Sequence, residues 1–398
     1  MKKLLLVGLL FISFACNVDL GGDETPANIP TSNILTGTIN TTTTLTSDRE
    51  WILKGYVYVT DGATLKIEEG TVIKSDISEK GALCIERGAK IDAQGTELKP
   101  IVFTSGKPNG EKSPGDWGGI ILLGKAKTNR LTEPTIEGGI GRAYGGDDDT
   151  DNSGVMKYVR IEYAGIAAMP NSEINALTFG GVGSGTTIEN IQTIYANDDA
   201  FEFFGGTVSP TNLYSYATAD DDFDFDFGYN GTVTNGIAKR VPDFVDSGDA
   251  GNGVECDNDG NGSDAKPTTH PKLNNMILIG PNTSDALPNH NLGLRFRRGT
   301  QFTMKNSIVF GWMKGGLSLE SVETAQYLKS GISVFESNQI GTFNPSNNFI
   351  SKVPDIITSD ELKVLALSKN NKEINSVLEN IAKPDWVNGW TRFPNVGF

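Results

Sequence analysis

The chain has 398 residues, with 34 lysines and arginines against 49 aspartates and glutamates, a formal net charge of −15. This balance excludes nucleic acid as a partner, because phosphate backbones bind basic surfaces. An acid excess with many Asp-Gly and Asp-Asn turns favours Ca²⁺, which takes oxygen ligands. There are 47 glycines, and short runs of valine, isoleucine and threonine lie between turn residues, which predicts a mostly β protein.

The first residues, MKKLLLVGLLFISFAC, combine a basic start with an apolar stretch of about twelve residues, too short to span a bilayer. The closing SFAC resembles a bacterial lipobox, which implies a signal peptide over residues 1–15 and a lipid on Cys16. The alternative is an ordinary secretory signal with a chance cysteine. The acids that follow Asn17 resemble the surface-export signals of Bacteroidota lipoproteins. We therefore expect an outer-membrane protein, anchored by its lipid and exposed at the cell surface, with a threonine-rich tether over residues 16–49.

Two pairs of segments repeat along the chain. ATLKIEEGTVI (63–73) matches GALCIERGAKI (81–91), 18 residues on, and NIQTIYANDDAFEFF (190–204) matches NLYSYATADDDFDFD (212–226), 22 residues on. Such periods, with alternating strands and glycine or asparagine turns, predict the coils of a parallel β-helix. The sequence frames of leucine-rich repeats and propellers are absent. We expect the β-helix over residues 50–350.

Residues 351–398 change character. SDELKVLALSKNNKEINSVLENI (359–381) has helical spacing and a Ser359 start, which predicts a helix. The closing PDWVNGWTRF (384–393) is expected to cover an open end of the stack, where strand edges would otherwise be unpaired.

Four stretches are more distinctive: GAKIDAQGTELKPIVFTS (88–105), GDWGGIILLG (115–124), NDDAFEFFGGTV (197–208) and DDDFDFDFGY (220–229). They resemble bacterial surface proteins with a pectate-lyase-like β-helix, among them outer-membrane lipoproteins of Bacteroidota. The resemblance implies an all-β fold, a single-stranded right-handed parallel β-helix with a short helical C-terminal cap. It implies no particular function, because β-helices carry lyases, hydrolases, adhesins and inert spacers.

The repeat also predicts which side chains point inward. Successive strand side chains alternate between faces, so the phenylalanines of 220–229 share one face and the acids the other. Burying a carboxylate costs several kcal/mol, whereas burying a phenylalanine gains about 2 kcal/mol, so the rings point inward. The inward columns are Leu177, Phe201, Phe223, Val254, Leu294 and Leu317, and Phe179, Phe203, Phe225, Cys256, Phe296 and Leu319.

Three outward columns follow from the same register. They are Thr178, Glu202, Asp224, Glu255, Arg295 and Ser318; Gly180, Phe204, Asp226, Asp257, Arg297 and Glu320; and Ala176, Ala200, Asp222, Gly253, Gly293 and Gly316. The register places Cys84 outward and Cys256 inward, so both are expected to be free thiols.

The outward columns define a candidate ligand face, with a shallow groove expected beside its glycines. Its residues are Glu202, Asp222, Asp224, Asp226, Glu255, Asp257, Arg295 and Arg297. Like charges about 5 Å apart repel, so this face needs arginines, a divalent cation or protonation to compensate.

Candidate calcium ligands lie in the turns beside this face. They are Asp198, Asp199, Asp220 and Asp221, together with Asp257, Asp259 and Asn261 of the loop DNDGNG (257–262). That loop matches the first six positions of a calcium loop, but position twelve is Thr268, which leaves an ordinary Asp/Asn/Gly turn as the alternative. GGDDDTDNSG (145–154) is a second loop of the same kind. At least one bound Ca²⁺ is expected.

Two enzymatic alternatives use the same face. In a pectate-lyase-like mechanism Arg295 or Arg297 would remove a proton beside bound Ca²⁺, but an arginine base needs a strongly depressed pKa. We favour the arginines as neutralisers of the acids and commit to no catalytic residue. A polygalacturonase-like hydrolase would also need Gly-His-Gly and Arg-x-Lys motifs, which the sequence lacks.

The favoured function is therefore non-catalytic: a cell-envelope lipoprotein whose acidic, Ca²⁺-loaded face binds a glycan or an outer-membrane partner protein. The alternatives are a Ca²⁺-dependent polysaccharide lyase or related carbohydrate-active enzyme, and a structural subunit of an outer-membrane assembly.

Overall fold

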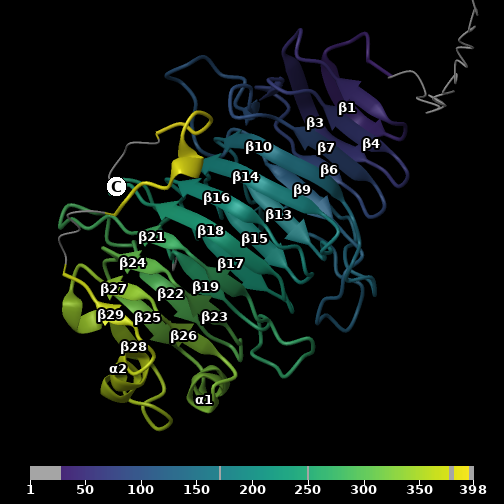
Figure 1. Ribbon diagram of the computed structural model, residues 1–398. Coiled ribbons are helices and arrows are strands. Elements are labelled where there is room, and N and C mark those ends of the chain that lie inside the picture. The colour runs from purple at the N-terminus through teal and green to yellow at the C-terminus, as the bar shows by residue number, and fades with distance from the viewer. Residues whose placement is uncertain (1–27, 170–171, 249–250, 376–380, 394–398) are drawn as a thin grey trace, which may run out of the picture.

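The computed structural model describes residues 28–169, 172–248, 251–375 and 381–393. Their strands form one 27-stranded sheet in which every pairing is parallel, wound into a solenoid (Figure 1). This confirms the predicted right-handed parallel β-helix. None of the helices among these residues combines the length and hydropathy that crossing a bilayer requires. Cys16 and the signal peptide lie outside the described residues.

Strands of successive coils pair into three ladders. Ladder A contains β2 (Thr43–Leu45), β4 (Thr64–Ile67), β7 (Lys90–Gln94), β20 (Lys272–Asn274), β23 (Thr303–Lys305) and β26 (Val334–Glu336). Ladder B contains β5 (Val72–Ser75), β8 (Ile101–Thr104), β21 (Ile277–Ile279), β24 (Ile308–Phe310), β27 (Gln339–Gly341) and β29 (Lys372–Glu373). Ladder C contains β6 (Leu83–Ile85), β9 (Ile120–Leu123), β13 (Leu177–Gly180), β15 (Phe201–Phe204), β17 (Phe223–Asp226), β19 (Val254–Cys256), β22 (Leu292–Phe296), β25 (Gly315–Leu319) and β28 (Phe349–Ser351).

Longer strands turn a corner and belong to two ladders. β1 (Ile34–Ile39) and β3 (Trp51–Val59) join ladders B and C, and ladders A and B share β10 (Gly154–Glu162), β14 (Thr187–Ile194), β16 (Thr211–Tyr216) and β18 (Thr232–Lys239). A separate antiparallel pair contains β11 (Ala167–Met169) and β12 (Ser172–Glu173).

Asparagines form the corner between ladders A and B. Asn190, Asn212, Asn235 and Asn275 have positive φ angles of 55° to 61°, a conformation that asparagine tolerates well. Each of the last three donates from Nδ2 to Oδ1 of the preceding member, over 2.8, 2.8 and 2.6 Å. The side chains therefore hold the same bend in successive coils.

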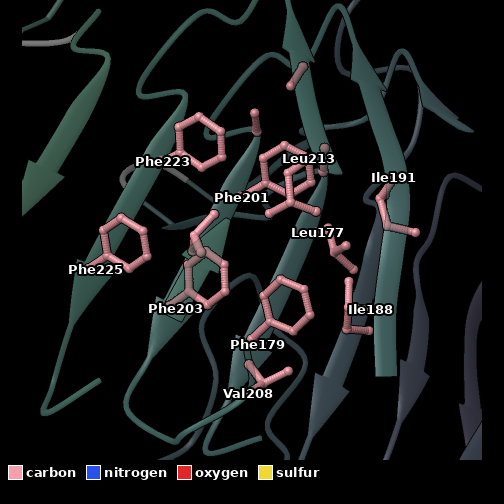
Figure 2. Close-up of a cluster of buried hydrophobic side chains, with 14 of the residues drawn as sticks. Leu177, Phe179, Ile188, Ile191, Phe201, Phe203, Val208, Leu213, Phe223 and Phe225 are labelled. Carbon is pink, nitrogen blue, oxygen red and sulfur yellow. The ribbon is translucent and has the colours of Figure 1, made fainter. Parts of the chain in front are cut away.

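The core confirms the predicted inward columns. Phe179 pairs with Phe203 and Phe203 with Phe225, and all three side chains are buried. Their ring centroids are 4.6 and 4.8 Å apart, close to the strand spacing of about 4.8 Å, so the rings stack along the solenoid (Figure 2). Cys256 belongs to the same buried column, whereas Cys84 lies on the outward side of ladder C, and both thiols are free as predicted.

The solenoid begins earlier than predicted. β1 pairs with β3 and β2 with β4, so the first coil lies within the segment expected to be a tether (16–49). Leu35 and Leu45 are buried in the common core. The threonine-rich composition concealed these strands, although threonine itself suits strands well.

The helices lie at the C-terminal end of the solenoid (Figure 1). They are α1 (Val322–Ser330) and α2 (Ser359–Leu367), with the short 3₁₀ turn η1 (Pro345–Asn347); a second 3₁₀ turn, η2 (Asp385–Val387), lies apart from them in the closing segment. Leu362 and Ala366 of α2 pack into the core, which confirms the helical cap. The helix is shorter than the predicted 359–381, because the chain returns to the sheet as β29.

The closing segment was placed wrongly in the prediction. Residues 381–393 do not cover the end of the stack but lie along the outer side of ladder B, beside β14 and β16 (Figure 1). Trp390 packs edge-on against Tyr158 at 5.7 Å, and Arg392 pairs with Glu162 at 3.0 Å. The outer side of ladder B is apolar and needs this cover, whereas α2 already covers the end.

Candidate functional site

The outer side of ladder C carries the predicted charged column. Glu202 pairs in register with Asp224, Asp224 with Glu255, and Glu255 with Arg295. The neighbouring column of Asp226, Asp257 and Arg297 follows, since the backbone NH of Asp257 donates to Phe225 and that of Arg297 to Cys256. Two of the three predicted outward columns are confirmed.

The third predicted column points inward, and no glycine-floored groove exists there. Ala176 and Ala200 belong to the core. A Cβ on Gly253 would lie 2.6 Å from Trp312 Cζ2, and one on Gly293 would lie 2.9 Å from Trp312 Cδ1. Ala176, Ala200, Asp222 and Gly253 stand one residue before their ladder C strands, where the alternation of strand side chains does not apply. The glycines make room for a buried indole.

Asp222 belongs to this inward column, so it is not part of the ligand face. Its side chain is fully buried and accepts a hydrogen bond from Arg240 Nε at 2.8 Å. Arg240 also donates to the carbonyl oxygens of Thr218 (2.7 Å) and Asn252 (2.6 Å), and its guanidinium lies 5.6 Å from the Trp312 ring. Arg240 stands in no repeat or motif of the sequence that would mark it as the partner of Asp222.

The arginines of the ligand face are engaged with its acids. Arg297 Nε donates to both oxygens of Asp257, at 2.8 and 3.0 Å, and Arg297 also pairs with Glu255. Arg295 pairs with Glu255 at 3.1 Å, and Arg298 with Asp257 at 2.7 Å. Although burial alone would lower the pKa of Arg297, Glu255 and Asp257 raise it. The arginines therefore neutralise this half of the face.

The loop at 257–262 closes on itself. Asp259 Oδ1 accepts hydrogen bonds from the backbone NH groups of Asn261 (2.8 Å) and Ser263 (3.0 Å), and Asp259 Oδ2 accepts from the Ser263 hydroxyl. Asp257 faces the arginines, and Asn261 is exposed. This arrangement supports the turn interpretation rather than a calcium loop.

The loop at 145–154 is held in a similar way. Asp148 and Asp151 accept hydrogen bonds from the backbone NH groups of Thr150 (3.0 Å) and Lys125 (2.8 Å), and Asp149 pairs with Lys127. These carboxylates are occupied in closing the loop.

Six carboxylates on and just before the ladder C strands lie close together, and none of these six forms an ion pair with a described residue. We call them the acid cluster: Asp198, Asp199, Glu202, Asp220, Asp221 and Asp224. Oxygen atoms of Asp198, Asp199 and Asp220 lie within 4.8 Å of one another, and so do those of Asp199, Glu202 and Asp224. Asp199 joins the two groups. Asp226 lies at the edge and accepts from the Phe227 NH at 2.8 Å.

Burial and mutual repulsion work against ionisation of this cluster. Burial first, and then the neighbouring carboxylates, raise the pKa of Asp199, Glu202 and Asp224 well above the usual range. Burial also raises the pKa values of Asp220 and Asp221 to about 7. A divalent cation would relieve the repulsion, because carboxylate oxygens are its preferred ligands.

Two members of the acid cluster stand in a column of asparagines. Asn175 Oδ1 accepts from the Asp199 NH (3.2 Å), Asp199 Oδ1 from the Asp221 NH (2.8 Å), and Asp221 Oδ1 from the Asn252 NH (2.6 Å). Asn252 Oδ1 accepts in the same way from the Leu292 NH. The shared hydrogen bond needs only an amide oxygen, so the negative charges of Asp199 and Asp221 are not required for it.

An apolar layer borders the cluster. Ile136, Ile140 and Tyr144, from the segment 131–146, pack on the outer side of ladder C against Ile121 and Phe204. The segment therefore covers the N-terminal part of this face, and the acid cluster begins where the cover ends.

The fold and the outer face define the class: a parallel β-helix with a cluster of largely buried carboxylates on the outer side of one ladder. The chain belongs to the pectate-lyase-like β-helix domain family, whose model matches residues 37–391. Membership fits a carbohydrate-related function. No curated protein and no solved structure matches the chain significantly.

Proposed function

We propose that this protein is a non-catalytic carbohydrate-binding lipoprotein of the cell envelope whose acid cluster holds Ca²⁺. The cation would lie between Asp199 and its neighbours, where two overlapping groups of oxygen atoms converge. A bound cation keeps open coordination positions for the hydroxyl or carboxylate oxygens of a glycan.

The main support for the proposal is the hydrogen-bond pattern of the asparagine and aspartate column. The corner column at Asn175, Asp199, Asp221 and Asn252 makes the same backbone hydrogen bond with either residue type. Two of its members are nevertheless carboxyl groups, whose ionised form burial disfavours by raising their pKa values. A buried charge of this kind lowers stability unless it is compensated, so a function for the extra oxygen is the physical reason to retain it.

The ion pairs of Arg295 and Arg297 favour a binding function over an enzyme in which one of these arginines removes a proton. An arginine base must lose its proton, yet the pKa of Arg297 is raised by two carboxylates that hold it on both sides. Arg295 shares Glu255 with it and also pairs with Glu320 at 3.3 Å.

We expect Asp199→Asn to reduce Ca²⁺ affinity at least tenfold without lowering the stability of the calcium-free protein. The amide oxygen can still accept from the Asp221 NH, while the shared ligand charge disappears. Titration calorimetry with Ca²⁺ and thermal unfolding in EDTA measure the two effects. Asp285→Asn, at an exposed loop position, is the matched control and should change neither. Unchanged Ca²⁺ affinity in Asp199→Asn would rule out the proposed site.

One set of experiments tests both whether the protein binds a glycan and whether it cleaves one. Binding to a panel of acidic and neutral polysaccharides in Ca²⁺, lost in EDTA, supports the proposal. An unsaturated uronate product absorbing in the ultraviolet would instead make the protein a lyase. A cation that raises the melting temperature without any glycan binding would favour a purely structural subunit.

The proposed envelope location depends on Cys16. We expect the chain to incorporate a labelled fatty acid in a bacterial host that processes lipoproteins, and Cys16→Ala to abolish the label, because only the cysteine thiol accepts the lipid. Gel fluorography after metabolic labelling checks this. Equal labelling of both chains would contradict the anchor.

A further inference from the structure

A second surface, outside the acid cluster, is hollowed where the chain leaves ladder C. Two adjoining depressions, of about 420 and 330 Å³, share Lys127 and Pro267. Their size falls within the range of about 300–1,000 Å³ that is typical of small-ligand sites. We call them together the ladder C groove. It is lined by residues of 127–134, 144–147, 206–207, 228–230 and 266–268, with Arg87, Asp149 and Gln301.

One half of the groove is cationic, although the chain as a whole is acidic. Arg87 pairs with Glu133 at 2.5 Å and Lys127 with Asp149 at 2.9 Å. Arg130 and Lys266 are exposed and form no ion pair with any residue that the structure describes. Asp147 also lines this half, so the groove as a whole keeps one net positive charge for a ligand.

Arg130 is held in place by aromatic stacking. Its guanidinium lies 4.5 Å from the Phe227 ring centroid, and Phe227 stacks on Phe204 at 5.6 Å. An arginine positioned in this way loses little conformational entropy on binding, and its planar fork suits a carboxylate or a sulfate. Lys266 donates to the Thr268 hydroxyl at 2.6 Å.

The other half offers neutral hydrogen-bonding groups. Asn230 Nδ2 donates to the carbonyl oxygens of Gly228 (3.1 Å) and Thr268 (2.9 Å), which fixes the amide. Gln301 and Thr207 line the same depression, together with the glycines Gly206 and Gly228. Fixed amides and hydroxyls beside a bare backbone suit the hydroxyl groups of a sugar ring.

We infer that the ladder C groove binds an oligosaccharide bearing a carboxylate or sulfate group, and that it does so without Ca²⁺. The charged group lies on Arg130 and Lys266, and the sugar hydroxyls lie on the neutral half. This inference goes beyond the proposed function, because none of the six acid-cluster residues lines the groove.

Binding in EDTA tests the inference. Neutral, uronate-containing and sulfated oligosaccharides are titrated by calorimetry at low and high salt. We expect at least one charged set to bind, the neutral set to bind more weakly, and added salt to weaken the charged interaction. The two charged arms distinguish a carboxylate from a sulfate as the recognised group. If none of the three sets binds in EDTA, the inference is wrong.

Variants separate this groove from the rest of the surface. Arg130→Ala combined with Lys266→Ala should weaken binding about ten- to hundredfold. Lys66→Ala combined with Lys90→Ala removes the same charge from exposed positions of ladder A and should have no effect. Asp199→Asn should also leave binding in EDTA unchanged, so failure at the acid cluster and failure here are distinguishable. Equal affinity of the groove variant and the original chain would overturn the assignment.

Discussion

Replacing Arg240 with methionine is expected to destabilise the protein by about 3–5 kcal/mol, since breaking a buried ion pair leaves an uncompensated charge. Arg240 and Asp222 both have fully buried side chains. The guanidinium also satisfies the carbonyl oxygens of Thr218 and Asn252, which would lose their donors. Methionine keeps most of the side-chain volume, so the measured loss reports the charge and hydrogen bonds. Urea unfolding monitored by circular dichroism gives the free energy of unfolding.

Two further variants sharpen this test. Adding Asp222→Asn to Arg240→Met should recover at least about 1 kcal/mol, because the isolated carboxylate is removed. Arg298→Met removes a surface arginine, paired with Asp257, and should cost less than about 1 kcal/mol. A cost below about 1 kcal/mol for Arg240→Met itself would mean that the pair is dispensable.

Most of the winding could be predicted from the sequence, because alternation and repeat length are local signals. The match of Phe201 and Phe203 to Phe223 and Phe225 fixed the register of two coils. The same register reached Leu294 and Leu317, although the connection between β18 and β19 is longer than those in the repeated coils. A strand register shifted by one residue is excluded for these apolar columns, because it would turn every ring towards solvent.

The inward position of Asp222 could not be predicted in this way. Alternation holds only within a strand, and β17 begins one residue later, at Phe223. The partner, Arg240, is 18 residues away and reaches Asp222 only because β18 lies in the same coil. Sequence periodicity carries no information about such a contact across the interior.

The asparagine and aspartate column did carry a signal that the sequence analysis overlooked. Asn175, Asp199, Asp221 and Asn252 each stand two residues before an inward member of ladder C. Aligning the coils therefore places these four residues in one column. Because both asparagine and aspartate occur there, the charges of Asp199 and Asp221 are not needed for the hydrogen bond that all four make. The calcium-free stability of the protein should depend on these two positions.

That dependence is expected to appear as a loss of stability with rising pH in EDTA. The pKa values of Asp220 and Asp221 are raised by burial to about 7, and those of Asp199 and Asp224, also chiefly by burial, lie well above their usual range. Their unfolded values lie near 4, so the folded state binds more protons over this range. Stability therefore falls as pH rises towards the folded pKa values.

The two histidines determine the lowest pH at which the effect of the carboxylates on stability can be measured. Burial lowers the pKa of His290 to about 4 and also lowers that of His270, so both contribute stability that is gained as pH rises towards 6.5. Below pH 6.5 this gain in stability opposes the loss of stability that the carboxylates cause. Above pH 6.5 the unfolded histidines lose their remaining charge within about one pH unit, so their opposing contribution is small and the carboxylates decide the sign.

Between pH 6.5 and pH 8 in EDTA, the free energy of unfolding should fall by at least about 2 kcal/mol, since each proton retained by the folded state contributes about 1.4 kcal/mol per pH unit and Asp199, Glu202 and Asp224 retain theirs as well. In Asp221→Asn the fall should be smaller, because the amide keeps the hydrogen bond from Asn252 and has no proton to lose. Saturating Ca²⁺ should abolish the fall, because the cation binds the ionised carboxylates. Urea unfolding at three pH values, with EDTA or Ca²⁺, measures all of this. A free energy that stays level or rises across this range in EDTA would mean that the cluster is ionised and compensated in some other way.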